Sequence, residues 1–153
     1  MKNPLEITLT TFHLGSVKRV VTLGLDGKDA ANDFLLKLAK ANPQGLQSIL
    51  KRLAAVAEHD RFENKITYRH VGDQVFEVKT KAGLRFYTCP DEIEGLGHQL
   101  IIAACGGKKG NRKEQSADIR NAKEIRKRYL KAKDSASIEL IPLPDETEDH
   151  ETC

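Results

Sequence analysis

Two alternating segments joined by a glycine-containing turn constrain the fold of this chain more than any other feature. The segments are residues 74–80 and 84–89, and Lys81-Ala82-Gly83 separates them. Polar and apolar side chains alternate along both segments, which predicts an antiparallel strand pair with a tight turn. Lys79 and Arg85 fall on one face of this pair. They either bind one phosphate together or belong to the solvated face of a half-buried sheet.

A third strand is predicted over residues 98–104, which are apolar on both faces and therefore central in a sheet. It leads into the sequence Gly106-Gly107-Lys108-Lys109-Gly110-Asn111-Arg112-Lys113. Glycines let backbone amides approach a phosphate, and cations this close together repel one another unless an anion neutralises them. A sheet with this arrangement of Lys and Arg is suited to a polyanion, and RNA is the first candidate.

The rest of the chain predicts an α+β domain in which a helical pair packs on a small, mostly antiparallel sheet with a C-terminal helix. A β-hairpin is expected over residues 6–25, helices over 30–40 and 44–58, a strand over 65–71, an acidic loop over 90–97, and a helix over 117–133 with Ser116 as its N-cap. Residues 1–133 are interpreted as one domain with an N-terminal hairpin extension over 1–28. Residues 134–153 are interpreted as an acidic C-terminal tail.

Charge is unevenly distributed between these two parts. All 25 Lys and Arg lie in residues 1–133 together with 15 of the 22 acids, which gives that part a net charge of +10. The last 20 residues contain seven acids and no Lys or Arg. A basic body attracts nucleic acid or an acidic protein. The tail either keeps the protein soluble or folds back over the basic face and competes with RNA.

Several classes of site and location are disfavoured by the sequence. There is no apolar run long enough to span a membrane, and the N-terminus lacks the apolar segment of a signal peptide. Cys89, Cys105 and Cys153 do not have metal-type spacing, and the five His are not paired. We therefore expect a cytoplasmic protein without a metal site or cofactor.

The motifs above resemble those of a known family. Phe76-Glu77-Val78-Lys79 followed by Gly83-Leu84-Arg85-Phe86-Tyr87 resembles the strand pair of toxins in the RelE/HigB superfamily. Gly107-Lys108-Lys109 with the helix from Ser116 to Tyr129 resembles the ending of HigB-type and phage-encoded relatives. The resemblance covers about residues 29–132, in the same order.

This resemblance implies a RelE-like fold and an mRNA interferase, a toxin that cleaves mRNA, often on the ribosome, and pairs with a cognate antitoxin protein. It implies that Lys79 and Arg85 bind the scissile phosphate and that Lys108 and Lys109 stabilise charge in the transition state. Tyr87 would act on a proton or stack on a base. Flanking phosphates would be bound by further cations, namely Arg112, Lys113 and Lys81. The sequence indicates no general base.

Two other functions fit the same residues. A ParE-type toxin uses a related scaffold to inhibit DNA gyrase, and would cleave no RNA. A non-catalytic RNA-binding regulatory module would bind RNA with a strong salt dependence and without turnover.

Overall fold

The computed structural model describes residues 6–59, 68–93, 99–108 and 112–146. These residues form an α+β fold around one seven-stranded sheet with the order β3-β4-β5-β6-β2-β1-β7. The α+β class is therefore confirmed. The β2–β6 and β1–β7 pairs are parallel and the other neighbours are antiparallel, so the sheet is mixed. The strands are β1 (Glu6–Leu14), β2 (Lys18–Leu25), β3 (Tyr68–His70), β4 (Phe76–Lys79), β5 (Arg85–Glu92), β6 (Gln99–Gly107) and β7 (Ser137–Ile141).

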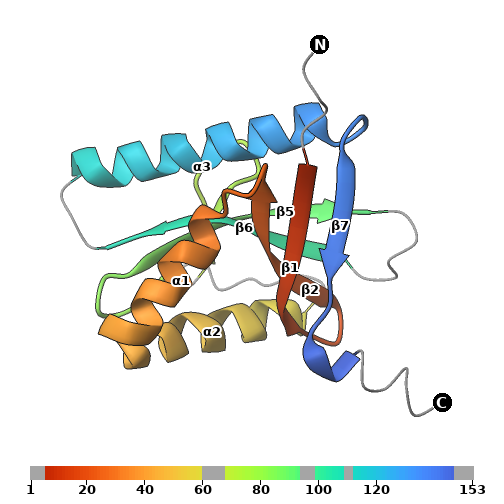
Figure 1. Cartoon of the computed structure of the whole chain (residues 1–153). Coiled ribbons are helices and arrows are strands. Elements are labelled where there is room, and N and C mark those ends of the chain that lie inside the picture. Colours follow the sequence, from red (N-terminus) through yellow and green to blue (C-terminus); the bar gives the residue numbers. More distant parts are fainter. Residues whose placement is uncertain (1–5, 60–67, 94–98, 109–111, 147–153) are drawn as a thin grey trace.

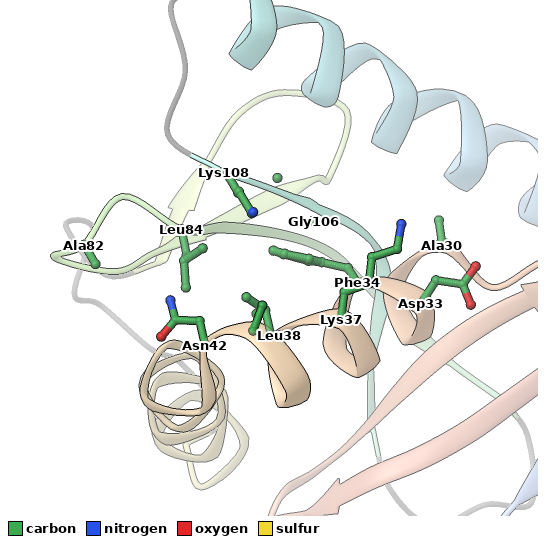
Figure 2. Close-up of a pocket in the computed structure, with 12 residues that line it drawn as sticks. Ala30, Asp33, Phe34, Lys37, Leu38, Asn42, Ala82, Leu84, Gly106 and Lys108 are labelled. Carbon is green, nitrogen blue, oxygen red and sulfur yellow. The ribbon is translucent and has the colours of Figure 1, made fainter.

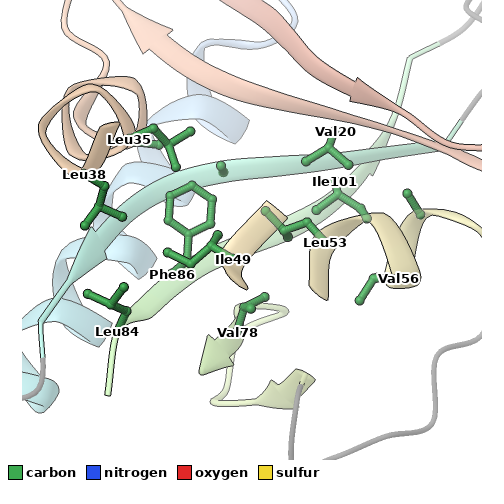
Figure 3. Packing of buried hydrophobic residues seen from close by; sticks show 13 residues of the cluster. Val20, Leu35, Leu38, Ile49, Leu53, Val56, Val78, Leu84, Phe86 and Ile101 are labelled. Atoms are coloured by element: carbon green, nitrogen blue, oxygen red, sulfur yellow. The ribbon is translucent and has the colours of Figure 1, made fainter. Parts of the chain in front are cut away.

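Helices cover both faces of the sheet (Figure 1). Helices α1 (Ala30–Ala41) and α2 (Pro43–Ala57) pack on one face, and α3 (Arg112–Ala132) packs on the other. On the first face, Phe86 lies among aliphatic side chains of both helices and of the central strands (Figure 3). On the second face, Ala122 and Tyr129 of α3 are buried against the sheet. No helix of the described residues is long and apolar enough to cross a membrane.

The helical pair forms as the sequence predicts, because each helix has a capping side chain. The carboxylate of Asp29 accepts a hydrogen bond from the Asn32 amide at 2.9 Å, and the Asn42 side chain accepts one from the Gly45 amide at 3.0 Å. Both bonds satisfy amides that have no partner inside the helix. Pro43 occupies the first turn of α2, where its missing N–H costs nothing. Both helices are confirmed to within a residue at either end.

The N-terminal hairpin is confirmed, but its interpretation as an extension of the domain is wrong. Strand β2 pairs in parallel with the central strand β6, from Lys18 opposite Gln99 to Thr22 opposite Ala103. Val20 and Val21 point to opposite faces of the sheet and are both fully buried. Apolar side chains on both faces require cover on both sides of the sheet, and α1 and α2 supply it on one side and α3 on the other. Pairing with β1 and β6 places β2 inside the sheet.

Two boundaries in the second half of the chain differ from the prediction. Strand β5 continues through Pro90 to Glu92 and pairs with β6, so those residues are not part of a loop. Helix α3 begins at Arg112, and Ser116 lies inside it instead of capping it, because the four residues from Arg112 to Gln115 are good helix formers. The beginning of the predicted strand, residues 65–67, and the predicted loop residues 94–97 lie outside the described residues.

The prediction of a solvated C-terminal tail is wrong for the residues from Ser137 to Glu146. Strand β7 pairs in parallel with β1, from Glu6 opposite Ser137 to Thr10 opposite Ile141. Its alternating pattern places Ile138 and Leu140 against the buried cluster beneath α3. The acidic composition of the segment favours its interpretation as a tail, although its apolar residues alternate with period two, as in a half-buried strand.

An ion pair fastens the chain beyond β7. The Arg19 guanidinium donates to both carboxylate oxygens of Glu146, at 2.9 and 2.6 Å, and its Nη1 also donates to Oγ1 of Thr11 at 2.9 Å. Only 9% of the Arg19 side chain is exposed. Two parallel N–H···O bonds to a carboxylate are stronger and more directional than a single contact. Glu146 is therefore a structural residue, and this part of the acidic segment lies on β1 and β2.

Candidate nucleic-acid interface

Three positions form a row across the end of the sheet. Lys79 of β4 lies opposite Arg85 of β5, and Arg85 lies opposite Gly107 of β6. Beyond this row the chain makes the turn that contains Lys81, and β6 leads toward the first turn of α3 (Figure 1). The row is therefore the point at which the predicted cations of three separate segments gather.

Five exposed cations surround this row, and we call them the basic rim: Lys79, Lys81, Lys108, Arg112 and Lys113. They come from β4, the β4–β5 turn, the end of β6 and the first turn of α3. Helix α3 adds to the positive potential, since it contains eight Lys and Arg and three acids. Such a concentration of exposed charge attracts phosphate polymers and makes their binding depend on salt. Lys109 lies outside the described residues.

Arg85 is placed in the row but beneath the surface. Only 9% of its side chain is exposed, and Asp118 in the early part of α3 interacts with it electrostatically. Its Nε lies 3.8 Å from Oε2 of Glu77, and its Nε and Nη1 have no hydrogen-bond partner among the described residues. Lys79 and Arg85 are thus neighbours, as the turn predicts, but only Lys79 faces the solvent.

Glu77 is the centre of a buried polar network on this face. Its carboxylate accepts hydrogen bonds from the Tyr87 hydroxyl at 3.1 Å, from Nε2 of Gln115 at 3.0 Å and from Nη2 of Arg69 at 3.3 Å. Glu77 itself is 2% exposed. The network connects α3 to β3, β4 and β5, so it fixes where the first turns of α3 lie over the row.

Tyr87 is fully buried in this network and keeps its proton. Burial raises the pKa of its hydroxyl well above the ordinary value, and the neighbouring Glu77 carboxylate raises it further. A phenol in this environment donates a hydrogen bond and does not accept a proton at neutral pH. The structure therefore places Tyr87 beneath the row, as a support for Glu77.

Asp118 is the acid nearest the row, and reasoning from the sequence missed it. Its carboxylate lies so close to Gly107 that a Cβ at that position would overlap with Oδ2 and would make the carboxylate shift. Partial burial raises the pKa of Asp118, and the Arg85 guanidinium opposes that rise. A partly exposed carboxylate with a raised pKa is a better proton acceptor than an ordinary one. Nothing in a single sequence pairs residue 107 with residue 118.

Lys108 lies on the opposite side of the sheet from Arg85 and Tyr87. Along β6 the residues alternate, so that Gly107 faces Asp118 of α3 while Gly106 lies against the ring of Phe34 in α1. Lys108 extends over a groove of about 720 Å³ between α1 and the ends of β5 and β6 (Figure 2). We call it the α1 groove, and its lining includes Phe34, Lys37, Leu38, Asn42, Leu84 and Lys108. The predicted cations are thus shared between two faces that meet at the basic rim.

The described residues contain no group of three or more His, Cys, Asp or Glu arranged to bind a metal ion. Comparison of the chain with protein-family models, with curated proteins and with solved structures found no match in any of the three.

Proposed function

We propose that this protein is the toxin component of a toxin–antitoxin system of the RelE/HigB type. It would be an endoribonuclease that cleaves mRNA in the cytoplasm, on the ribosome, and that a cognate antitoxin protein neutralises by forming a complex with it. The basic rim is the observation that carries this proposal, because it gathers five exposed cations from four segments at one end of the sheet. The resemblance of residues 76–79 and 83–87 to the toxin strand pair supports it.

The chemistry we propose is attack of a ribose 2′-hydroxyl on the neighbouring phosphate. The Asp118 carboxylate accepts the hydroxyl proton, an O2′–P bond forms, the P–O5′ bond breaks, and the leaving 5′-oxygen takes a proton from an ammonium group of the basic rim. The products are a 2′,3′-cyclic phosphate and a 5′-hydroxyl. Lys79 stabilises the extra negative charge that develops on the phosphate. Lys108, which lies on the other face of the sheet, binds a flanking phosphate of the strand.

Arg85 and Tyr87 contribute to this reaction as positioning residues. The buried guanidinium lies between Glu77 and Asp118 and interacts electrostatically with both. It orients the Asp118 carboxylate and raises the positive potential of the row from beneath. Tyr87 acts through its hydrogen bond to Glu77.

The test is induced expression in a bacterium, scored by growth and by mapping mRNA 5′ ends. We expect growth arrest with cleavages in phase with codons, and loss of both in the Lys79→Ala/Lys108→Ala and Asp118→Asn variants. Lys51→Ala, which removes an exposed cation of α2, is the matched control and should behave as the original protein. Unchanged cleavage in the Lys79→Ala/Lys108→Ala variant would contradict the proposal.

A second function is favoured by the burial of Arg85 and Tyr87. Both side chains lie beneath α3 beside the Glu77 carboxylate, to which Tyr87 donates a hydrogen bond and from which Arg85 Nε lies 3.8 Å away. Such burial suits a module that binds RNA without cleaving it. Salt-dependent RNA binding by the purified protein, without new 5′ ends in the cell, would establish this alternative. Growth arrest without mRNA cleavage would instead indicate a protein-directed toxin of the ParE type.

A further inference from the structure

The α1 groove has an apolar floor and charged sides. Phe34, Leu38 and Leu84 form its apolar part. The cations come from different elements, Lys37 from α1 and Lys108 from the end of β6 (Figure 2). Ligand sites commonly combine an apolar surface with a few polar groups that fix orientation. The occupant that suits this groove is therefore flat and apolar in one part and anionic in another.

The ring of Phe34 is held as a fixed platform within the groove. It lies against the backbone of Gly106, where any side chain would overlap with it. It also packs on Phe86, with a distance of 6.1 Å between ring centroids. Phe86 is fully buried, so this contact anchors the ring to the core. A nucleobase can stack on an aromatic ring whatever its identity, because every base has a π-face.

The polar groups around this ring match the other parts of a nucleotide. The Lys37 and Lys108 ammonium groups supply positive charge for a phosphate. Asn42 and Asp33 also line the groove and provide hydrogen-bonding groups for a base edge or a ribose hydroxyl. Lys108 belongs to the basic rim as well, so the groove is continuous with the surface on which the RNA strand is proposed to lie.

We propose that the α1 groove binds one nucleotide of the RNA strand, with its base on Phe34 and its phosphate between Lys37 and Lys108. The strand passes over the end of β6, from the face covered by α3 to the face covered by α1. This inference rests on the proposed function, since it assumes that RNA lies on the basic rim. It adds a nucleotide subsite that flanks the row of Lys79 and Arg85.

The experiment uses single-stranded RNA heptamers that each contain one 2-aminopurine, whose fluorescence falls when the base stacks. We expect quenching at one position of the heptamer when the full-length protein binds. Phe34→Leu, which keeps an apolar side chain, should abolish this quenching and weaken binding roughly 5- to 100-fold. Lys37→Ala should weaken binding and lower the slope of log K against log salt by about 0.7.

Lys40→Ala is the matched control, because Lys40 is an exposed cation of the same helix that does not line the groove. It should leave both the quenching and the salt slope unchanged. Circular dichroism and urea unfolding establish that each variant is folded. If quenching persists in the folded Phe34→Leu protein, if Lys37→Ala leaves the salt slope unchanged, or if Lys40→Ala lowers the quenching or the slope, the inference is overturned. Quenching of free 2-aminopurine riboside 5′-monophosphate without quenching of any heptamer would also overturn it.

The inference and the proposed function fail separately. If heptamer binding depends on Lys79 but not on Phe34 or Lys37, the proposal that RNA lies on the basic rim stands. Only the nucleotide subsite in the α1 groove is then contradicted. Absence of heptamer binding by the original protein removes both.

Discussion

Lys79 and Arg85 lie directly opposite each other on β4 and β5, but Lys79 faces the solvent and Arg85 is buried beneath α3. The difference arises from what lies above each strand. The first turns of α3 cover β5 and carry Gln115 and Asp118 over Arg85, whereas the end of β4 remains open. Two cations that share one face of a strand pair therefore differ in exposure, with Arg85 held inside the folded protein and Lys79 open to the solvent.

The first prediction compares the same replacement at these two positions. Arg85→Met should lower the free energy of unfolding by about 2–4 kcal/mol, because the buried Glu77 carboxylate loses its buried cation and keeps only the more exposed Arg69 nearby. Lys79→Met should change it by about 0.5 kcal/mol or less, as an exposed substitution. Urea unfolding measures both. The Arg85→Met/Glu77→Gln double variant should recover much of the loss, and equal midpoints for the two single variants would contradict the burial of Arg85.

The second prediction concerns Asp91, whose pKa depends on α3. Burial alone would raise the pKa of this carboxyl, but hydrogen bonds from Lys133 Nζ at 3.0 Å and from the Tyr129 hydroxyl at 2.5 Å lower it below the usual value. A lowered pKa in the folded state stabilises the protein above the unfolded pKa of about 3.9, and this contribution is lost as the pH falls through the folded value. Asp91→Asn should thus destabilise the protein at pH 7.

The stability difference between the original protein and Asp91→Asn should stay constant from pH 7 to about pH 5 and narrow below about pH 4. Urea unfolding across this range measures it. Asp73→Asn is the control, because the Asp73 side chain is 72% exposed and its 3.7 Å ion pair with Lys123 lies at the surface. A difference for Asp91→Asn that does not change with pH would contradict the ionised state of this residue.

The third prediction concerns the C-terminal segment. Glu146→Gln should destabilise the protein by about 2 kcal/mol, because Arg19 is buried and loses its charged partner. Removing residues 135–153 should destabilise it further, since the edge of β1 loses its partner strand and the apolar cluster beneath α3 loses Ile138 and Leu140. Removing only residues 147–153 keeps every described contact and is the control. Thermal unfolding compares the midpoints of the three proteins. Equal midpoints would show that residues 135–146 do not stabilise the fold.

The fourth prediction concerns two strand glycines. Gly106→Ala should destabilise the protein by about 1–3 kcal/mol, because the new methyl group would overlap with the Phe34 ring. Gly24→Ala in β2 should change stability by less than about 1 kcal/mol, since its nearest neighbour would be the Thr8 Cβ at 3.4 Å. Urea unfolding of both variants tests the packing of Phe34. A Gly106→Ala protein as stable as Gly24→Ala would show that the ring does not lie on this backbone.

Local signals in the sequence were sufficient for much of the fold. The caps Asp29 and Asn42, the alternation in residues 74–89 and the apolar stripe of α3 each follow from neighbours within a few residues. The positions of β2 and β7 could not be predicted in this way. Both depend on pairing with segments far along the chain, and no local pattern states which segments those are.

The cations of the candidate site could be predicted from the sequence, but its acidic residues could not. Lys79, Arg85 and Lys108 stand out because charge and glycine are concentrated around them in the sequence. Asp118 and Glu77 acquire their roles only when α3 is placed over the sheet, where one lies over Gly107 and the other accepts three hydrogen bonds. The division of the cations between two faces likewise depends on how β6 is oriented.

The parallel pairing of β1 with β7 has a consequence for the order in which the chain folds. Strand β1 can pair with its outer neighbour β7 only after α3 has been made, and β2 can pair with β6 only after β3, β4 and β5 have been made. Contacts between such distant segments close large loops before they gain stability, so folding is expected to be slow. On the ribosome the N-terminal hairpin would spend most of synthesis with an open edge. The seven-stranded sheet would therefore be complete only after α3 and β7 have both been made.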